Sequence, residues 1–265
     1  MSALFYTIPS FAQVDVLTQH NDLARTGWNN QETKLNTGNV NANSFGLLFK
    51  RTLDDQPYAQ PLIVSGVNIP GVGTRNVMYA CTVNNTVYAF DADNGAAGAY
   101  WQKNFNPTGY GPAHSNQMHP SLCGGGYSDF SDKIGIVGTP VIDKASNTIY
   151  FVTKVASTTP GVIDNHTYVR NQTPDDEYSY SSTGFFQYLH AVDLSTGAEK
   201  FGGPKQITAS SPGTGDGSVG GIISFDPRRA LNRSGLVLSR GIIYIAFGGH
   251  CDWNPRVSES GTGKR

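Results

Sequence analysis

Apolar and polar stretches alternate most regularly over residues 76–101, NVMYACTVNNTVYAFDADNGAAGAYW. Val77–Val83 and Thr86–Phe90 are short, rich in apolar and β-branched residues, and typical of strands. Asn84-Asn85 between them suits a two-residue hairpin turn, because asparagine tolerates a positive φ. Asp91–Gly95 predicts a second tight turn, in which the glycine is free to take a positive φ.

Two flanking segments extend this hairpin to a four-stranded unit. Ala59–Val64, marked by a proline, predicts a strand before the hairpin. Gly98–Phe105 predicts an outer strand after it, where Trp101 is large enough to cover a sheet face. The pattern therefore predicts a four-stranded antiparallel unit over about residues 58–105. Phe45–Leu53, FGLLFKRTL, predicts a further strand that has no hairpin partner before it.

The same order of patterns returns twice, which indicates a repeat architecture. Three later segments match the first strand, the second strand and the return strand with its Asp-x-x-x-Gly turn: Ile136–Asp143, Asn147–Lys154 and Gln187–Gly197. A third copy begins with Ser234–Leu238 and Gly241–Gly248, and its return strand is missing. Tyr79, Tyr150 and Tyr244 should then occupy equivalent positions. We expect units over about residues 58–105, 134–208 and, incomplete, 234–265. The polar stretch 106–133 reads as a long loop.

Composition agrees with an all-β chain. The 265 residues carry a net charge of −1, only 15% are charged, and Gly 31 and Pro 14 provide many turns. A near-neutral chain has no basic patch for nucleic acid, and no apolar run is long enough to span a bilayer. The three cysteines, Cys81, Cys123 and Cys251, match no metal-binding spacing, and Cys81 is expected to be a small core residue.

The first residues resemble the end of a secretory signal. Ala3–Ala12 is mostly apolar, and Ser10-Phe11-Ala12 resembles a small-x-small cleavage site. We therefore expect residues 1–13 to be a truncated signal peptide and the protein to be secreted or periplasmic. The alternative is an ordinary first strand. The mature chain, residues 14–265, would be one domain.

The repeated segments carry a family resemblance. Val87-Tyr88-Ala89-Phe90-Asp91-x-x-x-Gly95 followed by Trp101, together with Leu189–Gly197, resembles the repeat of quinoprotein (PQQ) alcohol dehydrogenase-like β-propellers. The resemblance implies four-stranded blades around a channel. About two and a half to three blades are visible, so the chain is expected to be a fragment of a larger propeller.

The resemblance also implies two kinds of function. The family includes non-catalytic scaffolds as well as pyrroloquinoline quinone dehydrogenases, in which a neighbouring cysteine pair and a calcium site hold the quinone. In this chain no two cysteines adjoin. We therefore expect a secreted ligand-binding or scaffold propeller without a cofactor. The alternative is an oxidoreductase that binds PQQ and calcium at the channel mouth.

Three motifs that resemble functional sites have simpler interpretations. His190 occupies the repeat position of Tyr88 and is expected to pack between blades. Asp91–Gly95 lacks the glycine and glutamate spacing of a calcium loop, which favours a hairpin turn. Gly215-x-Gly217-x-x-Gly220 matches dinucleotide-binding spacing, but a strand-like segment, Ile222–Phe225, follows it in place of the helix that this motif requires.

One set of polar residues lies in loops or just past strand ends, where a rigid scaffold positions functional groups. Two interpretations stay open for this set. Its members either form hydrogen bonds that hold the loops, or they form a site for a small molecule, a carbohydrate or a protein at the end of the channel. No metal site is expected. A polysaccharide-hydrolysing site lacks recognisable paired carboxylates. The set comprises His20, Asp22, Arg25, His114, His119, His250 and Asp252.

Overall fold

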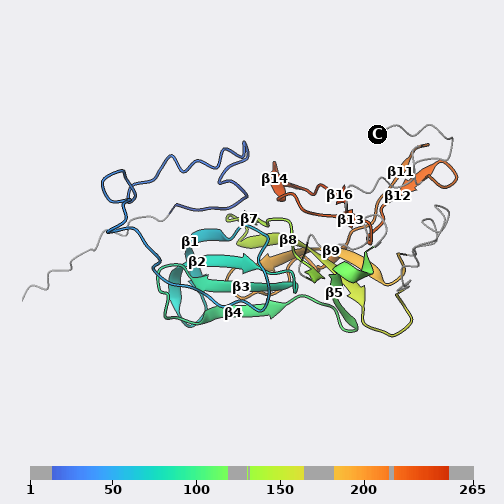
Figure 1. Cartoon of the computed structure of the whole chain (residues 1–265), viewed down its shortest axis with the longest axis horizontal. Helices are drawn as coiled ribbons and strands as arrows, with labels where there is room; N and C mark the ends of the chain where they lie inside the picture. Colours follow the sequence, from blue (N-terminus) through green and yellow to red (C-terminus); the bar gives the residue numbers. More distant parts are fainter. Residues whose placement is uncertain (1–13, 119–129, 131, 164–181, 215–217, 251–265) are drawn as a thin grey trace, which may run out of the picture.

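The computed structural model describes residues 14–118, 130, 132–163, 182–214 and 218–250 (Figure 1). These residues form antiparallel strands and loops, with one short 3₁₀ turn, η1 (Ser115–Gln117), and no α-helix within the described ranges. The all-β prediction is confirmed. The sheets of the described chain are open and none of them closes on itself, so the radial arrangement around a channel stays a prediction.

The first sheet contains the four predicted strands in sequence order. They are β1 (Leu62–Ile69), β2 (Gly73–Cys81), β3 (Thr86–Asp91) and β4 (Ala99–Asn104). Residues 86–91 are all buried, because strand β3 lies between two neighbours and both of its faces are covered. The predicted order of four antiparallel strands is therefore observed, over residues 62–104.

Both predicted turns of this unit differ in detail. The β2–β3 loop is wider than two residues, since the backbone of Thr82 already pairs with Thr86, and only Asn85 has a positive φ, 60°. Gly95 does not take the left-handed conformation predicted for it. A Cβ there would lie 2.4 Å from the Cβ of Phe49, so this position needs glycine for close packing.

The second sheet is larger than the predicted unit. Its three predicted strands are β7 (Val141–Asp143), β8 (Thr148–Ser157) and β9 (Phe185–Asp193), and the short β10 (Lys205–Gln206) pairs with β9. Strands β5 (Tyr110–His114) and β6 (Lys133–Ile134) extend it. Strand β9 pairs along one edge of β8, so β7 and β5 share the other edge. The prediction of a continuous loop over residues 106–133 was wrong at β5.

The third unit is a short hairpin, β14 (Val237–Ser239) and β15 (Ile242–Tyr244). Two further strand pairs flank it in the chain: β11 (Ser210–Pro212) with β12 (Ile222–Ser224), and β13 (Ala230–Leu231) with β16 (Gly248–Gly249). Strand β12 follows the glycine motif at residues 215–220, so a strand stands where a dinucleotide site needs a helix. Residues 1–13 and 251–265, and with them the predicted signal peptide, lie outside the described residues.

Phe45–Leu53 is not a strand. The segment is irregular and crosses the face of the β1–β4 sheet in Figure 1. The guanidinium carbon of Arg51, in this segment, lies 5.0 Å from the centroid of the Phe90 ring. The prediction was wrong because an apolar run forms a strand only where another strand offers hydrogen-bond partners.

The three units have the same register. In each, the tyrosine of the second strand pairs with an aliphatic residue of the first: Leu62 with Tyr79, Val141 with Tyr150, and Val237 with Tyr244. The two aspartate turns also match, because Oδ1 of Asp91 and Oδ1 of Asp193 each accept bonds from the backbone N–H groups two and three residues later. The predicted equivalence of the tyrosines is confirmed.

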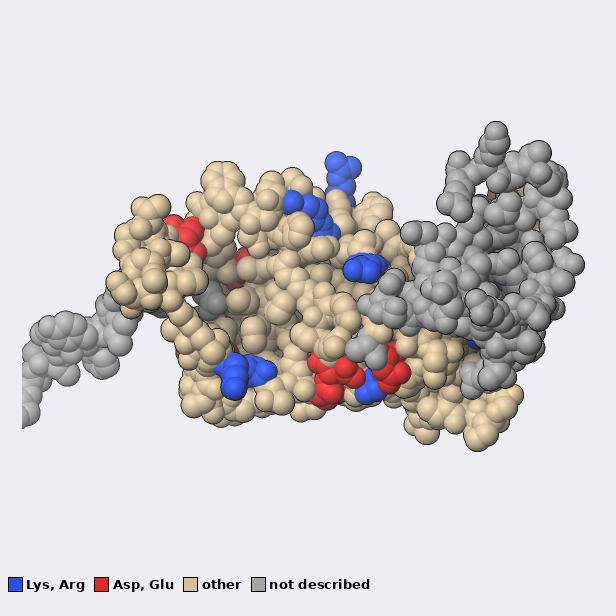
Figure 2. All heavy atoms as spheres, in the orientation of Figure 1, with Lys and Arg blue, Asp and Glu red and all other residues tan. Residues whose placement is uncertain are grey.

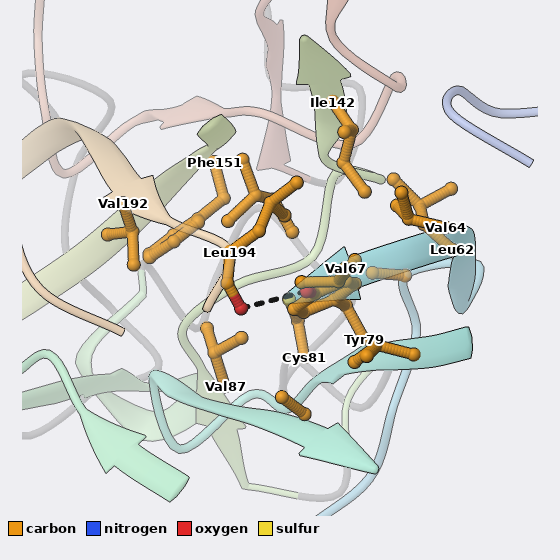
Figure 3. Packing of buried hydrophobic residues seen from close by; sticks show 14 of the residues in the cluster. Leu62, Val64, Val67, Tyr79, Cys81, Val87, Ile142, Phe151, Val192 and Leu194 are labelled. Carbon is orange, nitrogen blue, oxygen red and sulfur yellow. Dashed lines mark hydrogen bonds between the residues drawn. The ribbon is translucent and has the colours of Figure 1, made fainter. Parts of the chain in front are cut away.

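The sheets stack face to face. The face of the first sheet that carries Tyr79 packs on the face of the second sheet that carries Ile142 and Phe151, as Figure 3 shows. The Tyr79 hydroxyl donates a 2.8 Å hydrogen bond to the carbonyl of Leu194. Trp101 covers this interface, and its indole N–H donates to the same carbonyl at 2.9 Å. The role predicted for Trp101 is thus confirmed.

The next interface repeats this arrangement. The face of the second sheet that carries Tyr150 packs on Ile243 and Ile245 of the third unit. We call the face with the equivalent tyrosine the tyrosine face of each unit, and it meets the opposite face of the unit that follows. His190 is buried at the register position of Tyr88, as predicted. Cys81 is a buried free thiol in the core, also as predicted.

Candidate functional site

The segment Asp15–Arg25, which we call the strap, contacts the first strand of the first two units and the residues just before the first strand of the third. Val16 forms a bridge with Ile63 of β1. The carbonyl of Leu17 accepts a 2.8 Å hydrogen bond from Ile142 N of β7. Beyond it, the side-chain amide of Gln19 accepts a 2.9 Å bond from Gly235 N, just before β14. The strap therefore ties together the edges of three stacked sheets.

Three of the predicted site residues belong to the strap. The guanidinium of Arg25 donates to Thr18 Oγ1 at 2.7 Å and, across the molecule, to the carbonyl of Leu236 at 3.0 Å. The backbone N–H of His20, a residue with φ 55°, donates to the side chain of Gln60 at 3.0 Å. The bonds to Leu236 and Gln60 hold the strap on the third and first units, and the bond to Thr18 lies within the strap. This favours the loop-holding interpretation for Arg25 and for the His20 backbone.

The other predicted residues lie elsewhere. His114, at the end of β5, pairs through Nδ1 with Oδ1 of Asp132 at 2.9 Å. His250 is buried beside Lys154, and its Nε2 lies 2.6 Å from the Lys154 ammonium nitrogen. His119 and Asp252 lie outside the described residues. The described members of the set therefore occupy three separate places: the strap, the end of β5, and the surroundings of Lys154.

Lys154 anchors a buried polar cluster that sequence reasoning missed. It lies in β8 and is 3% exposed. Its ammonium donates to the carbonyls of Arg228 at 2.7 Å and Ala230 at 3.1 Å, as well as to His250. Burial lowers the pKa of Lys154 to about 7, although the nearby carboxylate of Asp226 opposes this shift. The signal was a lysine within the apolar run IYFVTKVA, since a buried cation needs partners.

His250 is buried next to Lys154. Burial, together with the charge on Lys154, lowers the pKa of His250 to about 2. The imidazole is therefore neutral, and its Nε2 accepts a hydrogen bond from the ammonium group. The cluster fixes residues 228–230 on the second sheet. It is enclosed by protein, which suits a structural role better than contact with a ligand.

A cavity of about 920 Å³ lies between the strap and the first sheet. Residues 28–34 and 48–49 complete its wall, and the first sheet contributes Ile63 with Ala92 and Asp93. The indole of Trp28 is 70% exposed. Figure 2 shows openings between the loop at the left of the view and the body of the molecule, next to a group of acidic side chains. Of the predicted residues that the structure describes, only Asp22 lines this cavity.

Three carboxylates that line the cavity, those of Asp15, Asp22 and Glu32, are stabilised in their ionised form. Hydrogen bonds from the hydroxyl and the backbone N–H of Thr26 lower the pKa of Asp22. The backbone N–H groups of Leu35 and Lys34 do the same for Glu32. Burial alone would raise the pKa of Asp15, but bonds from Lys144 and Ser65, each at 2.6 Å, outweigh it and the pKa is lowered. These groups are therefore acceptors at neutral pH.

A quinone site of the kind that the resemblance implies needs a neighbouring cysteine pair and ligands for a calcium ion. Within the described ranges no group of three His, Cys, Asp or Glu side chains is placed to hold a metal ion. The one described cysteine, Cys81, is buried, and burial raises the pKa of its thiol. These residues do not fit the quinone site that the family resemblance implies, and the oxidoreductase alternative stays a prediction. No helix in the described part is long and apolar enough to cross a membrane.

Comparison with known proteins does not assign the chain to a family. No protein-family model matches it, and no curated protein matches its sequence.

Proposed function

We propose that this chain is a non-catalytic binding module of propeller type, and that it holds a hydroxyl-rich ligand of the carbohydrate class in the cavity beside Trp28. The observation that carries the proposal is the cavity of about 920 Å³, which combines an exposed indole with amide and carboxylate side chains. Small-ligand sites are concave and of roughly 300–1,000 Å³, and a few polar groups fix the ligand's orientation.

The lining matches the chemistry of a sugar. A flat indole packs against the apolar C–H face of a pyranose ring, and Trp28 contributes this surface without being held in a core. The side chains of Asn29, Asn30 and Gln31 both donate and accept hydrogen bonds, as hydroxyl groups do. The ionised carboxylate of Asp22 accepts shorter and stronger bonds from hydroxyl donors than a neutral acceptor does.

The protonation of Asp15, Asp22 and Glu32 favours binding over hydrolysis. A glycoside hydrolase needs one carboxyl group whose pKa is raised, so that it is a proton donor at working pH. The pKa values of Asp15, Asp22 and Glu32 are all lowered by hydrogen bonds. These three groups therefore suit orientation of a ligand and lack the proton that general acid catalysis requires.

The propeller arrangement and export belong to the same proposal. The equal register of the three units and the repeated contact of each tyrosine face with the next unit support a propeller-like stack. The apolar segment Ala3–Ala12 supports a secreted or periplasmic location, where extracellular carbohydrate is available.

The test is calorimetric titration of the purified chain with a panel of neutral oligosaccharides. For a glycan that binds, Trp28→Ala should weaken affinity at least about tenfold, because the stacking surface is lost, which corresponds to about 1.4 kcal/mol. Phe201→Ala is the matched control, since Phe201 is an equally exposed aromatic residue, 66% exposed, outside the cavity. A panel without any binder, or a Trp28→Ala variant with unchanged affinity, would refute the proposed ligand or the proposed site, respectively.

The oxidoreductase alternative has a separate readout. Adding PQQ and calcium to the purified chain should produce neither a bound quinone absorption band nor dye-linked oxidation of alcohols or sugars if the chain is a binding module. Reconstituted activity would favour the alternative.

A further inference from the structure

The chain between the strap and the first unit has no hydrogen bond to any sheet. We call residues 28–48 the tether. Each hydrogen bond that the tether forms with described residues joins positions at most five apart. Residues 46–50 have no regular structure and form no hydrogen bond with any described residue. The backbone of the tether is therefore free to rearrange while the sheets stay intact.

Both ends of the tether are held firmly. Before it, the strap has backbone hydrogen bonds to β1 and β7, and Asp15 forms a 2.6 Å ion pair with Lys144. After it, the guanidinium of Arg51 donates to the carbonyls of Asn94 at 2.7 Å and Gly95 at 2.9 Å. A break within the tether would therefore leave the contacts on both sides in place.

The end of the tether presents apolar side chains to solvent. Phe45, Leu47 and Leu48 are 58%, 81% and 92% exposed. A serine endoprotease holds the side chain before the cleaved bond in a specificity pocket, and exposed loops are the preferred sites of nicking. Residues 46–50 offer a backbone without hydrogen bonds to the described chain, next to side chains that fit an apolar pocket.

Exposure alone does not make such a site, as a second aromatic residue shows. Phe201 is 66% exposed and has a φ of 55°. Its turn is closed by a 2.9 Å hydrogen bond from Gly203 N to the carbonyl of Lys200. Extending the backbone at Phe201 would break this bond, whereas extending it at Leu47 would break none within the described chain.

We propose that the tether is a processing site, at which an endoprotease with an apolar specificity pocket cuts the chain after Phe45, Leu47 or Leu48. Water is the second reactant. Its hydroxyl group joins the carbonyl carbon of the cleaved peptide bond, and its proton goes to the released nitrogen. The product has one new carboxylate and one new amino group, and no other bond changes.

The cut changes how the strap is held. In the intact chain, the tether keeps the strap near its sites on the sheets at an effective concentration that is roughly millimolar for a short flexible linker. After the cut, the same hydrogen bonds hold the strap as a separate fragment. Its retention then depends on protein concentration, so cleavage converts a fixed segment into a releasable one.

Limited digestion of the folded chain with trace chymotrypsin, followed by mass spectrometry, tests the site. Within the described residues, the first cut should follow Phe45, Leu47 or Leu48. The combined variant Phe45→Asp, Leu47→Asp, Leu48→Asp should slow this cut at least about tenfold, because an apolar pocket discriminates against a charged side chain. Phe201→Asp is the matched control and should leave the rate unchanged. Circular dichroism checks that both variants are folded.

A first described cut at Phe201 or within a sheet would overturn the proposal, and so would equal rates for the wild type and the combined variant. The fate of the strap is a separate readout. The two fragments of the nicked protein should elute together from a native gel-filtration column. Dilution should lower the melting temperature of the nicked protein and leave that of the intact protein unchanged. Fragments that separate at every concentration, or a nicked protein whose melting temperature ignores dilution, would contradict a releasable strap.

Discussion

At the residue scale, the burial of Lys154 and His250 makes stability depend on pH. The folded pKa of His250 is about 2 against 6.5 for a free imidazole, and that of Lys154 is about 7 against 10.5. The unfolded chain therefore binds more protons between pH 2 and 6.5, and again between pH 7 and 10.5. These two groups therefore make the free energy of unfolding rise with pH through both windows.

Melting temperatures measured across this pH range should show that rise. Because one proton is involved in each window, the slope is about 1.4 kcal/mol per pH unit where a single group titrates. The variant His250→Gln should be less dependent on pH between 3 and 6, since it has no imidazole to charge. Unchanged acid sensitivity in this variant would assign the effect to other groups.

The packing of Gly95 provides a second prediction at this scale. A methyl group at this position would lie 2.4 Å from the Cβ of Phe49, whereas Gly98 in the same loop has no atom within 4 Å of such a group. Gly95→Ala should therefore destabilise the chain by about 1–3 kcal/mol through overpacking, and Gly98→Ala should have little effect. Urea unfolding of the two variants compares them directly. Equal midpoints would show that residues 49–54 do not rest on this turn.

At the scale of elements, the segment that crosses the first sheet depends on one carboxylate. Asp54 accepts hydrogen bonds from Thr82 at 2.8 Å, Asn84 at 2.8 Å and Thr86 at 2.5 Å, all around the β2–β3 turn. Asp54→Ala removes these bonds and should lower stability by about 1–3 kcal/mol. Amide hydrogen exchange should become faster over residues 49–54 and stay unchanged in β9. Uniformly faster exchange would contradict a local role.

The elements that the sequence predicts best are those with a strong local pattern or a match to one. Strands β2 and β3 are rich in apolar residues and only four residues separate them. Strands β8 and β9 are farther apart in the chain, and their likeness to β2 and β3 made them predictable. Strand β5 was missed because YGPAH contains glycine and proline, and its partner β8 begins more than thirty residues later. A strand that depends on so distant a partner has little local signal.

At the scale of the whole molecule, the repeat could be predicted and the candidate site largely could not. The equivalence of Tyr79, Tyr150 and Tyr244 depends on repeated local patterns, and the structure confirms it. The cavity instead forms where the strap and residues 28–34 meet the first sheet, and only Asp22 of the predicted set lines it. Trp28 has no pattern around it, because its exposure depends on where distant segments come to lie.

The strap has a consequence for the order in which the molecule is completed. Gln19 bonds to Gly235 and Arg25 to Leu236, pairs separated by 216 and 211 positions. Contacts of such separation carry a large loop-closure entropy and form late in folding. A ribosome synthesises the strap before all three units, and its partners Gly235 and Leu236 follow more than 200 residues later. During synthesis, the first two units are therefore complete before the strap can form its hydrogen bonds to the third unit.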